Sequence, residues 1–326
     1  MFADNARRRR IVVGIDFSPA SFAAARWIAQ WLTEDGELTL VHSLVVPEFQ
    51  GILAEKFPLP HSLLENARAG AERRLRAFGA TLPHQGISFE IREGRPADTI
   101  ADVAREKAAE LVVVGKHGER EALRGYTGRT ADSLVRSAPS PVLMASGIRP
   151  GAPKRLLAAL TYSSITPFVI EWVQRIQAAS GARVVAINVV GSAVLSHVLT
   201  MSSVRTGRTP GNAELREIFG EDRDRWSRQL IDAGIPADKV TAEVVFGEVS
   251  EGLLAAAGDY GADMIIMGSH AGPVRRLLLG SAASAVLRNA EMPVLVVVEP
   301  NSGGISPDPA DEASAGVTDE AAIYAI

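Results

Sequence analysis

Three glycines with a fixed spacing follow a predicted buried strand and could form an anion-binding loop. Gly115 and Gly118 come directly after the apolar run 111–114, and Gly128 follows nine residues further on, before a predicted helix. Glycines let the backbone approach a ligand closely and leave N–H groups free to point inward. Because the positive end of a helix favours negative charge, a glycine at a helix start suits phosphate. The spacing matches neither a Walker loop nor the dinucleotide-binding fingerprint.

Asp16 is the carboxylate best placed to join this loop. It follows the apolar run 11–15, which predicts a strand buried on both faces. In an open α/β sheet, ligands bind outside the carboxyl ends of the strands. Asp16 is therefore placed to accept hydrogen bonds from a sugar hydroxyl or to hold a cation.

Two histidines, His117 and His270, occupy the same place in the two halves of the chain. We predict loop anchors that hydrogen-bond the backbone; ligand contact is the alternative, because a histidine beside phosphate can donate. The other histidines have no metal-ligand spacing, and the absence of cysteine excludes disulfides, thiolate nucleophiles and cysteine-ligated zinc. No metal site made by protein ligands is predicted.

The glycine loop occurs twice because the chain contains an internal repeat. Four pairs of segments match in the same order at offsets between 145 and 153: Val12 to Trp27 with Leu157 to Trp172, Ile91 to Gly94 with Val244 to Gly247, Ala109 to His117 with Ala262 to His270, and Pro141 to Met144 with Pro293 to Val296. The repeat predicts two domains, 8–147 and 153–300, joined by a short linker. Residues 301–326 carry acidic but no basic side chains, which predicts a disordered acidic tail.

Strand and helix patterns alternate within each copy. In the first copy, Ser18 is the expected N-cap of a helix with Pro19 in its first turn, and Trp27 lies on that helix's apolar face. The alternation predicts an α/β fold in which each copy forms a doubly wound, parallel five-stranded sheet. The last strands, 141–145 and 293–298, are apolar edges, so we predict that they pair with each other.

The composition is that of a globular protein with no sign of nucleic-acid or membrane binding. Of 326 residues, 47% are hydrophobic and 22% charged, and the net charge is −4. Non-specific nucleic-acid binding needs a basic excess and is not expected. Polar and small residues interrupt the uncharged stretch 184–204, so we predict a buried strand and an amphipathic segment instead of a membrane span. A cytoplasmic protein without a signal peptide is expected.

The glycine spacing after the fourth strand, together with Gly14-Ile-Asp-Phe-Ser18 after the first, resembles the universal stress protein family in its tandem two-domain form. The likeness covers about residues 8–300. It implies a homodimerising fold of the adenine nucleotide alpha hydrolase-like type. In ATP-binding members, the resemblance implies, adenosine lies near the first strand and phosphates lie on the glycine loop. Backbone atoms near Ser43 and Val189 would read the adenine.

The first copy departs from the family pattern at one place. It keeps Asp16 and the three glycines, but Arg129 stands where the family has serine or threonine, and Thr130 comes one position late. Two alternatives follow for Arg129. It adds a charged contact to phosphate, or its bulk fills the pocket.

The second copy departs at other places. It keeps Gly268 and the terminal Gly280-Ser281, but its loop is one residue short and Gly272 would have to replace the second glycine. Its first strand ends in Thr161, which removes the carboxylate. A carboxylate that holds ribose hydroxyls contributes more than one phosphate-facing hydroxyl, so the first copy is expected to bind more tightly.

These features predict a regulator that binds ATP, with Mg²⁺, and has no catalytic residues of its own. One alternative is an adaptor that has lost nucleotide binding and acts through dimer surfaces. Another is a slow ATPase or autophosphorylating enzyme, which is less favoured because no general base lies beside the loop. The expected partners are adenine nucleotide and either a second chain, in a homodimer, or the other copy, in an intramolecular pseudo-dimer.

Overall fold

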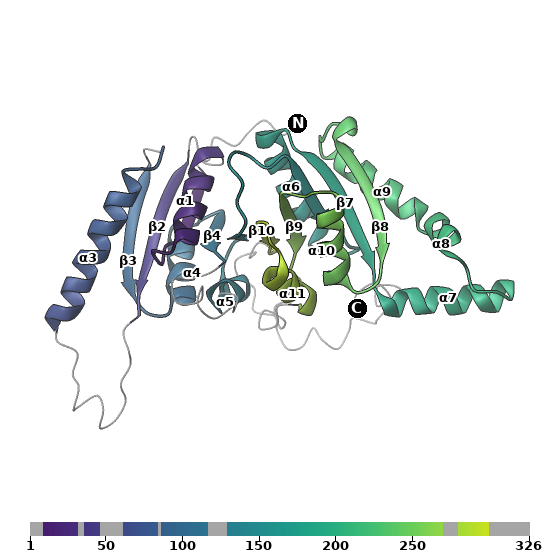
Figure 1. The fold of residues 1–326 in the computed structure, drawn as a ribbon, viewed down its shortest axis with the longest axis horizontal. Coiled ribbons are helices and arrows are strands. Elements are labelled where there is room, and N and C mark those ends of the chain that lie inside the picture. The colour runs from purple at the N-terminus through teal and green to yellow at the C-terminus, as the bar shows by residue number, and fades with distance from the viewer. Residues whose placement is uncertain are drawn as a thin grey trace, which may run out of the picture.

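The strands of both copies lie in one sheet in the computed structural model, which describes residues 9–31, 36–45, 61–83, 86–116, 129–269 and 280–299. The 10-stranded sheet has the order β3-β2-β1-β4-β5-β10-β9-β6-β7-β8 (Figure 1). The strands are β1 (Arg10–Gly14), β2 (Glu37–Leu44), β3 (Ile87–Glu93), β4 (Leu111–Gly115), β5 (Val142–Ala145), β6 (Arg155–Ala159), β7 (Arg183–Val190), β8 (Val240–Phe246), β9 (Met264–Gly268) and β10 (Val294–Val297).

Each copy contributes five strands in the same order, and all strand pairs within a copy are parallel. The predicted fold class is therefore confirmed. Short apolar strands that are buried on both faces produce this arrangement, as β4 and β9 illustrate, in which every residue but the last is buried.

The two copies join through their last strands, as predicted. β5 pairs with β10 in antiparallel fashion, with Leu143 opposite Leu295 and Val142 opposite Val296. All four side chains are almost completely buried. The pairing hides two apolar edges that would otherwise be exposed to other chains. The sheet edges that remain are β3 and β8.

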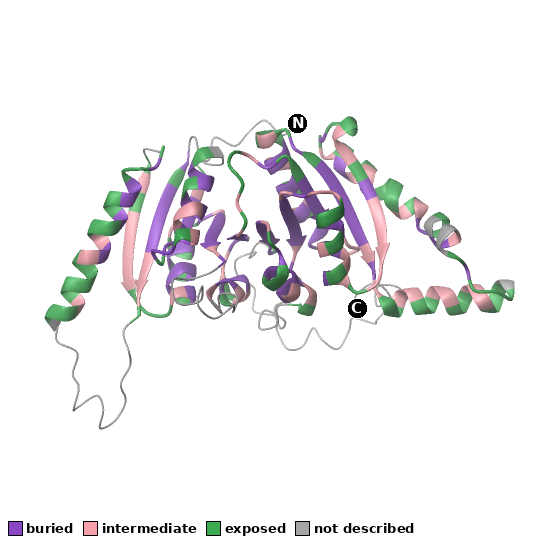
Figure 2. Cartoon of the chain, in the orientation of Figure 1, coloured by how far each residue is buried: buried purple, intermediate pink, exposed green. Residues whose placement is uncertain are grey.

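Helices cover both faces of the sheet (Figures 1 and 2). One apolar core includes side chains from the first two helices of the first copy and from their counterparts in the second, and another core lies on the opposite face. Both cores contain residues of both copies, so the packing is continuous across the junction. The helices of the first core are α1 (Pro19–Trp31), α3 (His61–Gly79), α6 (Thr166–Ser180) and α9 (Gly220–Asp232), and those of the second are α4 (Pro96–Glu106), α5 (Arg129–Ser137), α10 (Val249–Asp259) and α11 (Ser281–Asn289).

The start of α1 has the predicted cap. The Ser21 N–H donates to Ser18 Oγ over 3.1 Å, and Pro19 is the first helical residue. Trp27 and Trp172 are core residues, as predicted, with 4% and 8% of their surface exposed. The Trp27 indole N–H also donates to the carbonyl of Gly151 over 2.8 Å, so α1 holds the linker between the copies.

The second copy carries two additional helices, α7 (Ser192–Thr206) and α8 (Asn212–Ile218), between β7 and α9. β7 is the buried strand expected for this stretch. α7 extends from the end of β7 away from the sheet and has no buried segment (Figure 2). Its first half packs Val194 and Val198 against a small cluster made by Val190, Leu215 and Phe219, whereas Val204 is 79% exposed. None of the helices in the described part of the chain is long and apolar enough to cross a membrane.

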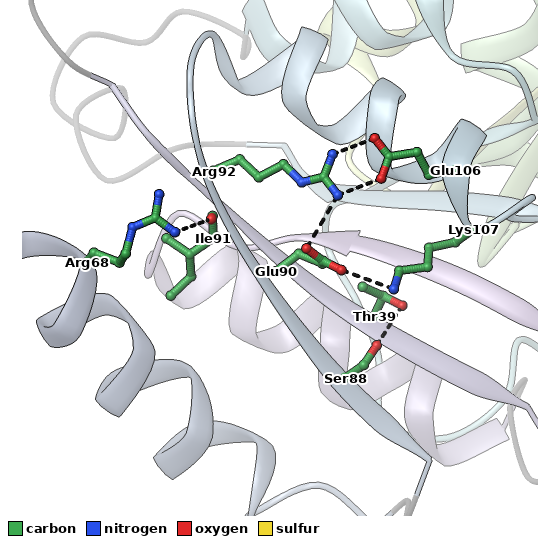
Figure 3. A network of polar contacts seen from close by, with 8 residues as sticks. All are labelled: Thr39, Arg68, Ser88, Glu90, Ile91, Arg92, Glu106 and Lys107. Carbon is green, nitrogen blue, oxygen red and sulfur yellow. Dashed lines mark hydrogen bonds and ion pairs between the residues drawn. The ribbon is translucent and has the colours of Figure 1, made fainter. Parts of the chain in front are cut away.

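A network of charged side chains lies along β3, the outer edge of the first copy (Figure 3). Arg92 donates to both carboxylate oxygens of Glu106 over 2.6 Å each and lies 3.4 Å from Glu90. Lys107 lies 3.0 Å from Glu90. The Glu106 carboxylate raises the pKa of Arg92 further above its usual range. Charged side chains at a sheet edge discourage pairing with another chain.

Candidate functional site

A cavity of about 340 Å³ opens at the carboxyl ends of β6, β7 and β9 in the second copy. This is the edge of an open α/β sheet at which ligands bind. Four of the predicted site residues line the cavity: Val189, Gly268, Gly280 and Ser281. The structure therefore brings together the described part of the predicted second site.

The first turn of α11 forms one side of this cavity. Gly280 is the N-cap and Ser281 the first helical residue, and no side chain in the described part of the chain caps this helix start. A Cβ atom added at Gly280 would meet no heavy atom of the described residues within 4 Å. The N–H groups of the first turn have no partner within the helix, so this end can bind an anion such as phosphate.

Other parts of the cavity wall are apolar. Val190 and Met267 come from strands, Leu253 comes from α10, and Val194 and Phe219 come from the α7–α8 segment. A planar, weakly polar group could pack against these side chains. The polar side chains at the cavity are Thr161, Tyr162, Asn188, Asp222, Ser269 and Ser281.

In the first copy, the predicted Asp16 lies two residues beyond the end of β1 and is exposed. Its carboxylate accepts a hydrogen bond from the Ser18 N–H over 3.0 Å, in a turn that leads into α1. The next residue, Phe17, has a φ of 65°, an uncommon left-handed conformation for a bulky side chain. Asp16 is thus presented on a constrained turn at the ligand-binding edge of the sheet.

Ser43 and Val189 occupy equivalent places, one residue before the ends of β2 and β7. The sequence placed them just after these strands, and the strands extend one residue beyond them. The Ser43 hydroxyl donates to the carbonyl of Gly94 over 2.7 Å, so this side chain binds the turn after β3. Val189 lines the second-copy cavity.

A further pair of equivalent residues supports the ends of the first strands. His42 Nδ1 lies 2.7 Å from the carbonyl oxygen of Ile15. In the second copy, Asn188 Nδ2 donates to the carbonyl of Leu160 over 2.8 Å. The His42 ring also packs on Phe17, with a centroid distance of 4.3 Å. Burial lowers the pKa of His42 below its usual range. Sequence reasoning did not assign a role to either residue.

Two of the predicted glycines have a packing role. A Cβ atom at Gly115 would lie 2.9 Å from the backbone nitrogen of Ser21, and one at Gly268 would lie 2.6 Å from Ile165 Cγ2. Contacts this short do not occur in folded proteins, so glycine is required for α1 to approach β4 and for the start of α6 to approach β9. The close packing of these helices on the strands therefore explains why glycine stands at both positions, whether or not a ligand binds there.

Several predicted residues lie outside the described part of the chain, and the prediction for them stands untested. They are His117, Gly118, Gly128, His270 and Gly272. Arg129 and Thr130 form the start of α5, and Thr130 is half-buried; the side chain of Arg129 is also outside the described part. The predicted tail, 301–326, is outside it as well.

Sequence reasoning missed Tyr162 and Asp222. The Tyr162 hydroxyl donates to Asp222 Oδ1, and both side chains line the cavity. Tyr162 directly follows Thr161, so its position next to the strand end was a usable signal. Asp222 lies in the charged run 221–225, which reads as a solvated helix face, and only the tertiary structure singles it out.

Two doubly wound α/β domains, paired through their last strands and with a cavity at the strand ends of the second, define a tandem α/β protein. The sequence model of the universal stress protein family matches residues 7–146 and 153–298. The chain belongs to this family.

Relatives that match nearly the whole chain are also tandem-length proteins. A universal stress protein of Mycolicibacterium smegmatis is 29% identical over 302 residues, which cover 88% of this chain and 96% of the relative. One from Mycobacterium tuberculosis is 25% identical over 310 residues, covering 89% and 97%. A solved universal stress protein from Archaeoglobus fulgidus has a TM-score of 0.60 at 17% identity and covers 89% of this chain and 96% of its own, a likeness of fold.

Proposed function

We propose that the protein binds an adenine nucleotide, ATP in particular, and acts as a regulator in a stress response. The observation that carries the proposal is the second-copy cavity, which combines an apolar wall with a helix N-terminus that no described side chain caps. An adenine base suits the apolar wall near Val189, and a phosphate chain suits the first turn of α11. A cavity of about 340 Å³ is within the range of small-ligand sites.

We propose binding without turnover. Among the described residues that line the cavity, Asp222 is the one carboxylate, and it already accepts the Tyr162 hydroxyl. The described part of the chain also has no group of three or more histidine or acidic side chains that could hold a metal ion. An accompanying Mg²⁺ would therefore be held mainly by the phosphates, as is common for this ion.

We further propose that any association of two chains uses a surface other than the last strands. β5 and β10 already pair with each other within the chain, so this surface is not available to a second copy.

Release of a bound nucleotide on denaturation tests the proposed function directly. The purified protein is denatured in acid, the supernatant is analysed for adenine nucleotide, and ATP binding to the native chain is measured by calorimetry. Gly280→Val places a side chain over the first turn of α11, where no described atom lies within 4 Å of the new Cβ, and should reduce ATP affinity at the second site about tenfold or more.

Gly211→Val is the matched control. Gly211 is also a helix N-cap, its φ is −82°, and a Cβ atom there would meet no heavy atom within 4 Å. This variant should bind ATP as the wild type does. A protein that releases no nucleotide and binds none in calorimetry would instead be an adaptor that acts through its surfaces.

A further inference from the structure

The second-copy cavity has no carboxylate at the end of its first strand. Thr161 stands there, where the first copy has Asp16. The Thr161 hydroxyl lies 2.8 Å from Ser163 Oγ, and its carbonyl accepts a hydrogen bond from the Thr166 hydroxyl. The strand end therefore offers the cavity a neutral residue whose polar groups are engaged in the turn before α6.

A carboxylate reaches the same cavity from α9. Asp222 lies in the first turn of this helix, is half-buried and lines the cavity together with Thr161 and Tyr162. Tyr162 donates its hydroxyl to Asp222 Oδ1. Among the residues that the structure describes, no other group bonds to this carboxylate, so Oδ2 keeps its full capacity to accept hydrogen bonds from a ligand.

The Tyr162 ring that orients Asp222 is itself in contact with two neighbouring side chains. The ring centroids of Tyr162 and the buried Trp226 are 4.8 Å apart, and the Arg225 guanidinium carbon lies 5.0 Å from the Tyr162 centroid. A ring packed in this way presents its hydroxyl in a fixed direction. The carboxylate is thus pre-positioned at the cavity before any ligand arrives.

The two copies carry their carboxylates at exchanged positions. In the first copy the residue after Asp16 is Phe17, and the Arg74 guanidinium carbon lies 3.9 Å from its ring centroid, as Arg225 lies over Tyr162. Three residues before each arginine stand Ala71 and Asp222, respectively.

The first copy therefore has aspartate at the strand end and alanine on the helix, whereas the second has threonine at the strand end and aspartate on the helix. Phe17 has no hydroxyl, and Ala71 offers no carboxylate. The tyrosine and the aspartate occur together in the copy that lacks the strand-end carboxylate.

We propose that Asp222, oriented by Tyr162, replaces the missing strand-end carboxylate in the second copy and reads the vicinal hydroxyls of a ribonucleoside 5′-phosphate. This inference rests on the proposed nucleotide binding and names the feature of the nucleotide that the second site selects. A carboxylate accepts hydrogen bonds and cannot donate them, so it favours a sugar with hydroxyl donors over one without. The second copy is then a ribose-selective site and not a weakened version of the first.

The test compares ATP with 2′,3′-dideoxy-ATP by calorimetry on the full chain, in an Asp16→Ala parent that weakens the first copy. The parent should bind ATP about tenfold more tightly than the dideoxy nucleotide. Asp222→Asn, which still accepts the Tyr162 hydroxyl, should lower ATP affinity to the dideoxy value and leave dideoxy-ATP affinity unchanged. Thr161→Asp combined with Asp222→Ala should restore the preference for ATP.

Asp224→Asn, an exposed carboxylate on the same helix, is the matched control and should have no effect. Equal losses of affinity for both nucleotides in Asp222→Asn would give Asp222 a purely structural role and overturn the proposal, and so would unchanged affinities. A parent that binds neither nucleotide overturns the proposed second site itself, which distinguishes the two failures.

Discussion

His42 in the first copy has Asn188 as its equivalent in the second copy, so His42→Asn introduces a residue that already occupies this position in the same fold. Both side chains bind the carbonyl at the end of the first strand, over 2.7 and 2.8 Å. His42→Asn should therefore keep the hydrogen bond to Ile15 and lose only the ring contact with Phe17, about 0.5–1.5 kcal/mol. His42→Ala also leaves the carbonyl unpaired, so its total cost at pH 8 should be about 2–4 kcal/mol.

The pH dependence of stability shows which part of the effect of His42→Asn comes from the charge of the imidazole ring. Burial lowers the pKa of His42 in the folded chain, so the unfolded chain binds the proton more tightly. Between the folded pKa and the unfolded value near 6.5, the free energy of unfolding of the wild type therefore falls as the pH falls. His42→Asn lacks this loss, so its stability deficit relative to wild type should shrink between pH 8 and pH 5.5.

Urea denaturation of the wild type, His42→Asn and His42→Ala at both pH values measures these differences. His197→Asn is the control, because His197 is exposed on α7 and its replacement should leave the stability unchanged. The reasoning is refuted if asparagine and alanine cost the same at pH 8, or if the deficit of His42→Asn is equal at both pH values.

Three further predictions concern the junction and the second copy. Lys116 is buried and donates to the Ala290 carbonyl at the end of α11, and burial lowers the pKa of its ammonium group. The free energy of unfolding of the wild type should therefore rise with pH between that lowered pKa and the unfolded value of about 10.5. In urea titrations, Lys116→Met should lack this rise. Leu143→Ala, in the β5–β10 junction, should cost about 2–5 kcal/mol in thermal unfolding, and a cost below about 1 would contradict the buried pairing. Asp263 accepts two backbone N–H groups where β6 begins, so Asp263→Ala should cost about 2 kcal/mol in chemical denaturation, against no change in the exposed Asp259→Ala.

Much of the fold could be predicted because its signals are local. The runs of β-branched residues and the Ser18-Pro19 helix start lie within short segments, and the repeat shows up as matching short segments in the two copies. The pairing of the two last strands was also predictable, since an apolar edge must be covered. Four residues that the sequence placed in the second site, Val189, Gly268, Gly280 and Ser281, line the cavity.

Some glycines were predicted as ligand-binding residues although they also have a packing role, because one residue can serve both purposes. Gly115 and Gly268 were predicted from a loop motif, yet each is also required where a helix backbone or side chain meets a strand. The additional helices α7 and α8 were not predicted as cavity walls. Their stretch of sequence has a mixed apolar and polar pattern that does not specify which neighbour it contacts.

The sequence by itself determined the duplication, the doubly wound sheets and the strand ends at which a ligand would bind. Only the tertiary structure decided which side chains meet there. Tyr162 and Asp222 are 60 residues apart in the chain, and Lys116 and Ala290 are 174 apart. Hydrophobic periodicity fixes which face of a helix packs on the sheet, but the contact between two particular side chains depends on the helix's position along the strands. That position results from the close packing of the whole core and is not encoded in any short segment.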